Sequence, residues 1–142
     1  MDKQQVTIFW FRRDLRLEDN VALFHALQSK YPVIPLFIFD TDILNSLSKN
    51  DGRVGFIHES LQKINAQLNA IGSSLLIKNG TTTSVWESLF QEFSISEVFF
   101  NKDYEPYAIK RDLAIEALAK VNNAACFSFK DQVVFEELEI TK

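Results

Sequence analysis

The chain has 142 residues, 46% of them hydrophobic and 24% charged, which fits one ordinary globular domain rather than two. Its formal net charge of −4 argues against a domain that binds nucleic acid through its overall charge, although a local basic patch is compatible with it. We expect neither a membrane span nor a signal peptide. The single cysteine, Cys126, excludes an internal disulfide and predicts a buried, inert thiol in a cytoplasmic protein.

Five short apolar runs predict β-strands. They cover residues 6–11, 33–39, 74–77, 97–100 and 125–129. Several of them lack the alternation of apolar and polar residues that a half-exposed strand shows. Continuous apolar runs of this kind are typical of parallel strands that are covered on both faces.

Apolar residues recur at helical spacing between these runs. The longest such stripe consists of Val54, Ile57, Leu61, Ile64, Leu68 and Ile71, and Gly72 then has the usual position for a helix end. A short helix is predicted from Asn20, with Leu23, Phe24 and Leu27 as its apolar residues.

Two further helices are predicted in the second half of the chain. Residues 83–93 follow capping hydroxyls and carry Val85, Trp86, Leu89, Phe90 and Phe93 on one side. Pro106 suits the first position of the last helix, whose predicted apolar face consists of Ile109, Leu113, Ala117, Leu118 and Val121.

Strands and helices thus alternate along the whole chain. This order predicts an α/β, Rossmann-like, doubly wound domain with a five-stranded parallel sheet in the order 3-2-1-4-5 and helices on both faces. The switch point of such a sheet lies between the first and fourth strands. We therefore expect a ligand at the loops that follow those strands, residues 12–20 and 101–105.

Both loops carry charged side chains. The first contains Arg12, Arg13 and Arg16 beside three carboxylates, and arginine can clamp a phosphate, a carboxylate or a partner domain. Composition alone favours a solvated loop with local ion pairs and a helix cap at Asn20. The second loop combines polar, charged and aromatic residues that suit a planar heterocycle, or equally the start of a helix.

Several common signatures are absent from the sequence. No Gly-x-Gly-x-x-Gly follows the first strand, and no P-loop, nucleophile elbow or cysteine/histidine zinc cluster is found. These absences argue against a typical dinucleotide site and against a metal site.

Four segments in order carry a family resemblance. Residues 9–20 read FWFRRDLRLEDN, residues 36–40 LFIFD, residues 53–57 RVGFI, and residues 101–107 NKDYEPY, followed by Arg111 and Asp112. Together they resemble the DNA photolyase/cryptochrome family over essentially the whole chain. The first matches that family's opening signature, and the others match its second strand, its next helix start and its fourth-strand turn.

The resemblance implies a protein of two domains. Residues 1–130 correspond to the family's N-terminal α/β domain, which holds an antenna chromophore, and residues 131–142 to the start of the interdomain linker. A larger helical C-terminal domain, expected to be absent from this chain, holds FAD, binds damaged DNA and splits pyrimidine dimers with light. The chain alone is therefore expected to have no catalytic residues and no repair activity, and its partners are that helical domain and, through it, DNA.

The resemblance also suggests the chromophore and its contacts. Folate-binding members carry Asn-Glu where this chain has Tyr107-Ala108, so 8-hydroxy-5-deazaflavin or FMN is expected in preference to methenyltetrahydrofolate. The residues expected to bind the chromophore are Arg12, Phe37, Phe39, Asp40, Arg53, Asn101, Asp103 and Glu105. Arg13, Asp14 and Arg16 are expected to be structural or to dock the helical domain.

Two alternatives stay open at this point. The parent protein can be a cryptochrome that signals in blue light, because the N-terminal domain does not distinguish signalling from repair. A stand-alone nucleotide-binding α/β domain is the other, and it leaves the four motifs unexplained.

Overall fold

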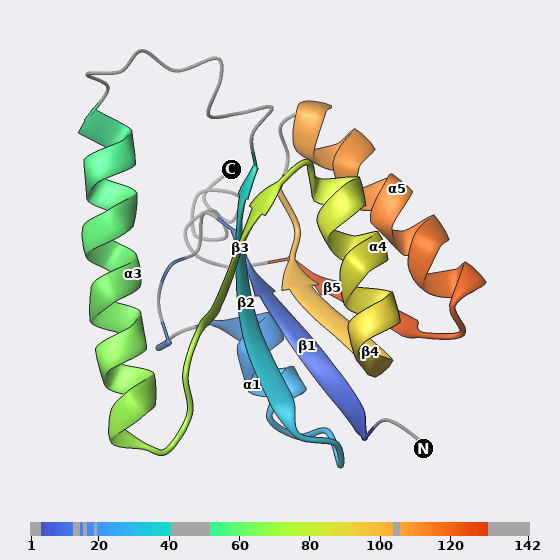
Figure 1. Ribbon diagram of the computed structural model, residues 1–142, viewed down its shortest axis with the longest axis horizontal. Coiled ribbons are helices and arrows are strands. Elements are labelled where there is room, and N and C mark those ends of the chain that lie inside the picture. The colour runs from blue at the N-terminus through green and yellow to red at the C-terminus, as the bar shows by residue number, and fades with distance from the viewer. Residues whose placement is uncertain are drawn as a thin grey trace, which may run out of the picture.

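A five-stranded sheet forms the centre of the molecule (Figure 1). Its strands are β1 (Gln5–Phe11), β2 (Val33–Asp40), β3 (Leu76–Gly80), β4 (Ser94–Asn101) and β5 (Ala125–Phe129). All four neighbouring pairs are parallel, and the order is β3-β2-β1-β4-β5, so the predicted topology is confirmed. This computed structural model describes residues 4–12, 15, 17–18, 20–40, 52–103 and 106–130, without the side chains of 52–56.

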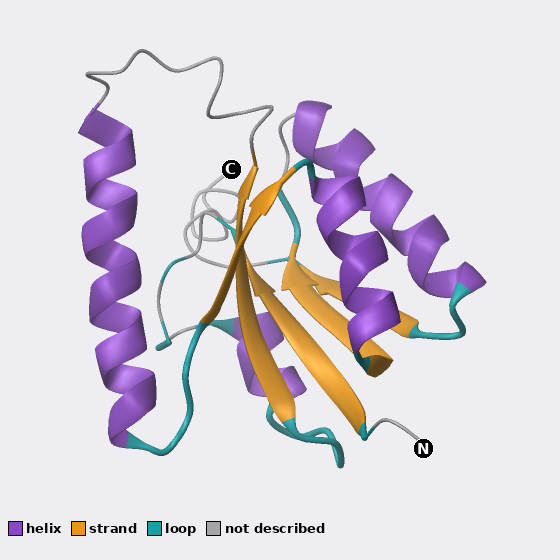
Figure 2. Cartoon of the chain, viewed as in Figure 1, coloured by secondary structure: helices purple, strands orange, loops and turns teal. Residues whose placement is uncertain are grey.

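Helices cover both faces of the sheet (Figure 2). They are α1 (Val21–Ala26), α3 (Gly52–Ala70), α4 (Thr82–Glu92) and α5 (Pro106–Val121). Side chains of α1 and α3 pack on one face, and side chains of α4 and α5 pack on the other. Because both faces are covered, the strands need apolar residues at successive positions, which accounts for their continuous apolar runs.

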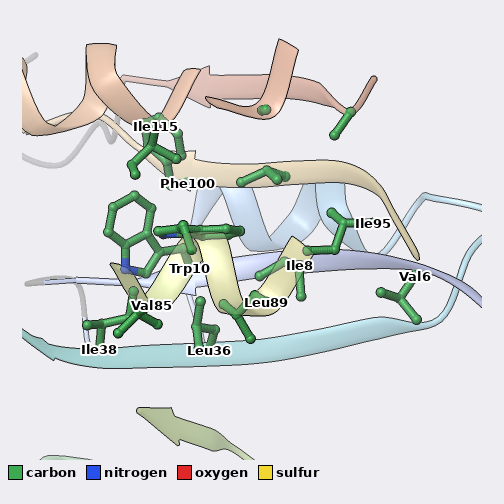
Figure 3. Close-up of a cluster of buried hydrophobic side chains, with 14 residues drawn as sticks. Val6, Ile8, Trp10, Leu36, Ile38, Val85, Leu89, Ile95, Phe100 and Ile115 are labelled. Carbon is green, nitrogen blue, oxygen red and sulfur yellow. The ribbon is translucent and has the colours of Figure 1, made fainter. Parts of the chain in front are cut away.

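The face under α4 and α5 is built around Trp10 (Figure 3). The Trp10 ring meets Trp86 of α4 and Phe100 of β4 edge-on, with ring centroids 5.4 and 5.6 Å apart. Leu89 and Ile115 are fully buried in the same cluster. Trp10 is the last residue of β1 that faces α4 and α5 before Arg12, so this aromatic cluster lies directly next to the end of the strand.

The opposite face is rich in phenylalanine. Phe9 and Phe11 of β1 and Phe37 and Phe39 of β2 are buried there, together with Leu61, Ile64 and Leu68 of α3. The three α3 residues belong to the predicted stripe, whereas Ile71 lies beyond the helix end and is exposed. In the short helix, Leu23 is buried, but Phe24 and Leu27 are exposed.

The predicted helix ends are also found. The Asn20 side chain caps α1 by accepting from the Leu23 amide, and Thr81 Oγ1 caps α4 by accepting from the Ser84 amide. Gly72 has a φ of +85° just after α3, in the left-handed region where glycine is favoured. The local sequence therefore specifies where these helices begin and end.

Helix α5 differs from its predicted orientation. Its buried residues are Ala108, Asp112, Ile115 and Ala119, while Ile109, Leu113 and Val121 of the predicted apolar face are exposed. Apolar residues occur on all sides of this helix, so periodicity does not single out one face. The small residues allow α5 to approach the sheet closely, and they place Asp112 in the buried stripe.

We predict that Gly80→Ala destabilises the domain more than Gly72→Ala. Gly80 has a φ of +144°, a conformation that side chains rarely adopt, and an added Cβ would lie 3.2 Å from Val85 Cγ2. Gly72 also has a positive φ, but an added Cβ there meets nothing within 4 Å. Urea unfolding should show a loss of about 2–3 kcal/mol for Gly80→Ala and about 1 kcal/mol for Gly72→Ala. Equal losses would contradict this account.

Candidate functional site

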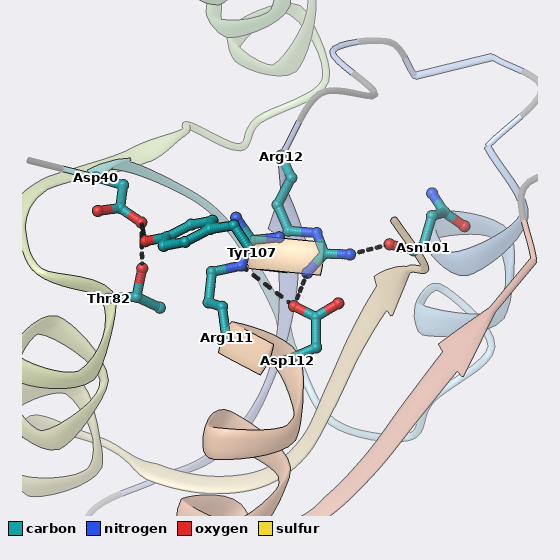
Figure 4. A network of polar contacts seen from close by, with 7 residues as sticks. All are labelled: Arg12, Asp40, Thr82, Asn101, Tyr107, Arg111 and Asp112. Atoms are coloured by element: carbon teal, nitrogen blue, oxygen red, sulfur yellow. Dashed lines mark hydrogen bonds and ion pairs between the residues drawn. The ribbon is translucent and has the colours of Figure 1, made fainter. Parts of the chain in front are cut away.

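A network of polar side chains lies at the carboxyl ends of β1, β2 and β4, on the face covered by α4 and α5 (Figure 4). This is the predicted switch point between β1 and β4, where ligands of doubly wound sheets bind. Strand ends supply Arg12, Asp40 and Asn101, and the first turn of α4 and the first two turns of α5 supply the remaining groups.

Arg12 is buried and faces α5. Its Nη1 donates to Asp112 Oδ1, and its Nη2 donates to the backbone carbonyl of Asn101. The guanidinium carbon lies 4.8 Å from the centroid of the Trp10 ring and 4.4 Å from that of Phe100, so the cation also rests on two aromatic rings. Arg12 thus ties the end of β1 to β4 and α5.

Asp40 ends β2 on the same face. Its Oδ2 accepts hydrogen bonds from Thr82 Oγ1 at 2.8 Å and from the Tyr107 hydroxyl at 2.6 Å. Tyr107 therefore spans from α5 to β2, and its ring lies along the network between Asp40 and Arg111 (Figure 4). Two elements far apart in the sequence meet through this one carboxylate.

The Asn101 side chain faces α1 instead. Its Oδ1 accepts from the Ala22 amide at 2.9 Å, and its Nδ2 donates to Asn20 Oδ1 at 2.7 Å. The asparagine thereby holds the start of α1 against the end of β4. Its backbone carbonyl accepts from Arg12 and so joins the network.

The other predicted chromophore contacts are distributed differently. Phe37 and Phe39 are buried on the α1/α3 face, opposite to Asp40, because side chains alternate along a strand. Asp103 is half-buried after β4. The Arg53 side chain, Glu105, Arg13, Asp14 and Arg16 lie outside the part that the structure describes. For each of these residues the proposed role stays a prediction.

Four residues of the network were not among the predicted contacts. They are Thr82, Tyr107, Arg111 and Asp112. The sequence favours a helix cap over a phosphate contact for the segment that contains Thr82. One signal for Asp112 was available in the sequence. Positions 108, 112, 115 and 119 have the spacing of one helix face, and Asp112 is the charged residue among two alanines and an isoleucine.

Cys126 of β5 lies beneath this network. Burial and then the negative charges of Glu116 and Asp112 raise the pKa of its thiol to about 12, although the nearby Arg12 lowers it. Such a thiol is almost entirely protonated at neutral pH and is a poor nucleophile. The raised pKa agrees with the predicted inert thiol, but Cys126 is half-buried and not fully buried as predicted.

The comparison with known proteins decides the family. The model of the DNA photolyase family matches residues 7–142. The chain belongs to this family. Over 89% of the chain it is 33% identical to the deoxyribodipyrimidine photo-lyase of Synechococcus, and over 95% it is 31% identical to cryptochrome-1 of Aedes aegypti.

Solved structures of the family share the fold. The archaeal photolyase from Sulfolobus tokodaii, described with two FAD molecules, matches 87% of this chain with a TM-score of 0.76 and 32% identity. The Synechocystis cryptochrome matches 92% with a TM-score of 0.83, and at 18% identity it supports the fold alone. The chain spans about a quarter of the two curated relatives, 26% of each.

None of the helices in the described part of the chain is long and apolar enough to cross a membrane. In the same part of the chain, no group of three or more histidine, cysteine or acidic residues is placed to hold a metal ion.

We predict that Asp112→Asn strongly destabilises the fold, because it leaves the buried guanidinium groups of Arg12 and Arg111 without their shared carboxylate. Breaking a buried pair in this way costs about 3–5 kcal/mol. The control is Glu92→Gln, which removes the half-exposed ion pair with Lys78 and should cost less than about 1 kcal/mol. Similar urea midpoints for the two variants would show that Asp112 does not hold the network.

We predict that native Cys126 reacts slowly with a disulfide reagent at pH 8, because its raised pKa leaves very little thiolate. In urea the thiol should return to an ordinary pKa and react much faster. The time course of thiol release, followed by absorbance, measures both rates. Equally fast reaction in the folded and unfolded chain would contradict the raised pKa of Cys126 in the folded chain.

Proposed function

We propose that this chain is the antenna-binding domain of a photolyase, and that its chromophore is a flavin or a deazaflavin. The observation that carries this proposal is the network of Asp40, Tyr107, Arg111 and Arg12 at the switch point of the sheet. A planar heterocycle with polar ring edges requires an aromatic surface and a few fixed donors and acceptors. The network offers the Tyr107 ring, the Asp40 carboxylate and guanidinium donors together.

Helix α5 argues against a folate antenna. Where folate-binding members carry a glutamate, this chain has Ala108, which is only 3% exposed. A glutamate at this position would have to be buried, whereas alanine packs closely. The relative from Sulfolobus tokodaii, which is described with two FAD molecules, supports a chromophore of the flavin class.

The proposed role of the domain is to bind and orient the chromophore, without catalysing a reaction. When bound, the antenna absorbs light and passes the excitation energy to FAD. FAD, the contact with damaged DNA and the splitting of pyrimidine dimers belong to the helical domain of the parent protein. We place that parent in the cytoplasm.

We predict that the chain binds FMN or 8-hydroxy-5-deazariboflavin more tightly than methenyltetrahydrofolate. Fluorescence titration of the chain with each compound measures the three dissociation constants. Asp40→Asn should weaken flavin binding roughly tenfold, the usual effect of losing one charged hydrogen-bond partner. Glu92→Gln, at an exposed carboxylate on α4, should leave binding unchanged. If none of the three compounds bound, the antenna proposal would be wrong.

A cryptochrome parent is the second candidate, because cryptochrome-1 of Aedes aegypti matches the chain about as well as the Synechococcus photolyase does. The two candidates differ in the activity of the parent protein. Repair of pyrimidine dimers under blue light supports a photolyase, and FAD binding without repair supports a signalling protein.

A further inference from the structure

Arg111 carries a buried donor without an acceptor. Its Nε donates to Asp112 Oδ1 at 3.2 Å, and its side chain is only 10% exposed. Its Nη2 is buried and has no hydrogen-bond partner in the described part of the chain. A charged donor that has lost its water without gaining an acceptor is unfavourable, so the site would gain from an oxygen placed there.

The charges around Arg111 favour an anion. Arg12 and Arg111 share one oxygen of Asp112, and the three side chains are 6%, 10% and 10% exposed. One carboxylate between two guanidinium groups leaves this buried trio with a positive charge. A negatively charged ligand atom at Arg111 would pair with a guanidinium that shares its carboxylate with Arg12.

Arg111 also lies beside an exposed aromatic ring. It is in the second turn of α5, whose amino end carries the positive end of the helix dipole. Tyr107 precedes it by one turn, and the guanidinium carbon is 5.8 Å from the centroid of the Tyr107 ring. That tyrosine is 42% exposed, so the ring borders both solvent and the buried cation.

We propose that Arg111 is the residue that recognises an oxyanion of the bound chromophore. This oxyanion is either the phosphate of a flavin nucleotide or the ring oxygen of an 8-hydroxy-5-deazaflavin, and both offer a negatively charged acceptor to a guanidinium. Arg12 is less suited, because both of its terminal nitrogens already donate to Asp112 and to the Asn101 carbonyl. The inference rests on the proposed antenna function and assigns the specificity of that site.

The first test uses inorganic phosphate and no chromophore. Thermal unfolding is followed in phosphate and in chloride at equal ionic strength, for the wild-type chain, Arg111→Gln, Arg111→Lys and Lys110→Gln. Lys110 is the exposed neighbouring cation on α5, so its variant removes the same charge outside the network. Phosphate should raise the unfolding temperature of the wild-type chain and of Lys110→Gln, less that of Arg111→Lys, and not that of Arg111→Gln. The same rise in all four would overturn the assignment.

The second test compares pairs of ligands that differ in the presence of one anionic group. The pairs are FMN with riboflavin, and 8-hydroxy-5-deazariboflavin with its analogue that lacks the 8-hydroxyl. The wild-type chain should bind the anionic member of one pair at least about tenfold more tightly, and that pair identifies the oxyanion. Arg111→Gln should abolish the preference, and Lys110→Gln should retain it.

The two tests separate the two proposals. Tight binding of both members of each pair, with no preference and no effect of Arg111→Gln, overturns the role of Arg111 and leaves the antenna function in place. Stabilisation by phosphate that depends on Arg111, with no binding of any chromophore, supports the anion site and removes the antenna function. Circular dichroism of Arg111→Gln checks that the observed losses do not arise from unfolding, and Arg111→Lys, which keeps the cation, should retain part of the effect.

Discussion

The requirement that a buried charge be paired shapes this end of the molecule. Arg12 follows the central strand directly, and its side chain enters the space between the sheet and α5, above Trp10 and Phe100. A guanidinium there needs a carboxylate, and Asp112 supplies it. The pair fixes how α5 lies on the sheet, and with it the positions of Tyr107 and Arg111. Much of the geometry of the candidate site therefore depends on the contact between Arg12 and Asp112, which forms within the protein itself.

The two arginines of the network, Arg12 and Arg111, have different roles. Arg12 joins three elements of the fold, and Arg111 has a donor to spare although it shares the same carboxylate. A ligand that contacts Arg111 contacts the residue that shares the Asp112 carboxylate with Arg12. Binding and folding are linked at this point, so occupancy of the site should stabilise the folded chain.

The sequence predicts the fold well because local and global signals agree. The apolar runs specify the strands, and helix ends are specified by the caps at Asn20 and Thr81 and by the turn at Gly72. The strand order follows from the alternation of strands and helices. The orientation of α5 was not predicted correctly, because larger apolar residues such as Leu113 are exposed while Ala108 and Ala119 are buried. Close packing against the sheet favours small residues, and a count of hydrophobic positions does not detect that preference.

The candidate site was predicted in its location but only partly in its members. Strand ends can be placed from topology, and Arg12 and Asp40 do lie in the network there, while their contact with a chromophore stays a prediction. The direction of a side chain at a strand end depends on one residue of register, which puts Phe39 and Asp40 on opposite faces. Thr82 and Asp112 lie on helices. Whether they face the site depends on how each helix is rotated about its axis, and packing determines that rotation.

The separation of Arg12 and Asp112 has a consequence for the time course of folding. The two residues are 100 positions apart, so their contact closes almost the whole described chain. Contacts of such separation form late, because the entropy of loop closure must first be overcome by the intervening elements. On a ribosome, β1, β2 and β3 emerge well before α5. Until α5 arrives, the guanidinium of Arg12 stays in water, and the end of the sheet where the ligand is expected is completed late, with only β5 still to follow.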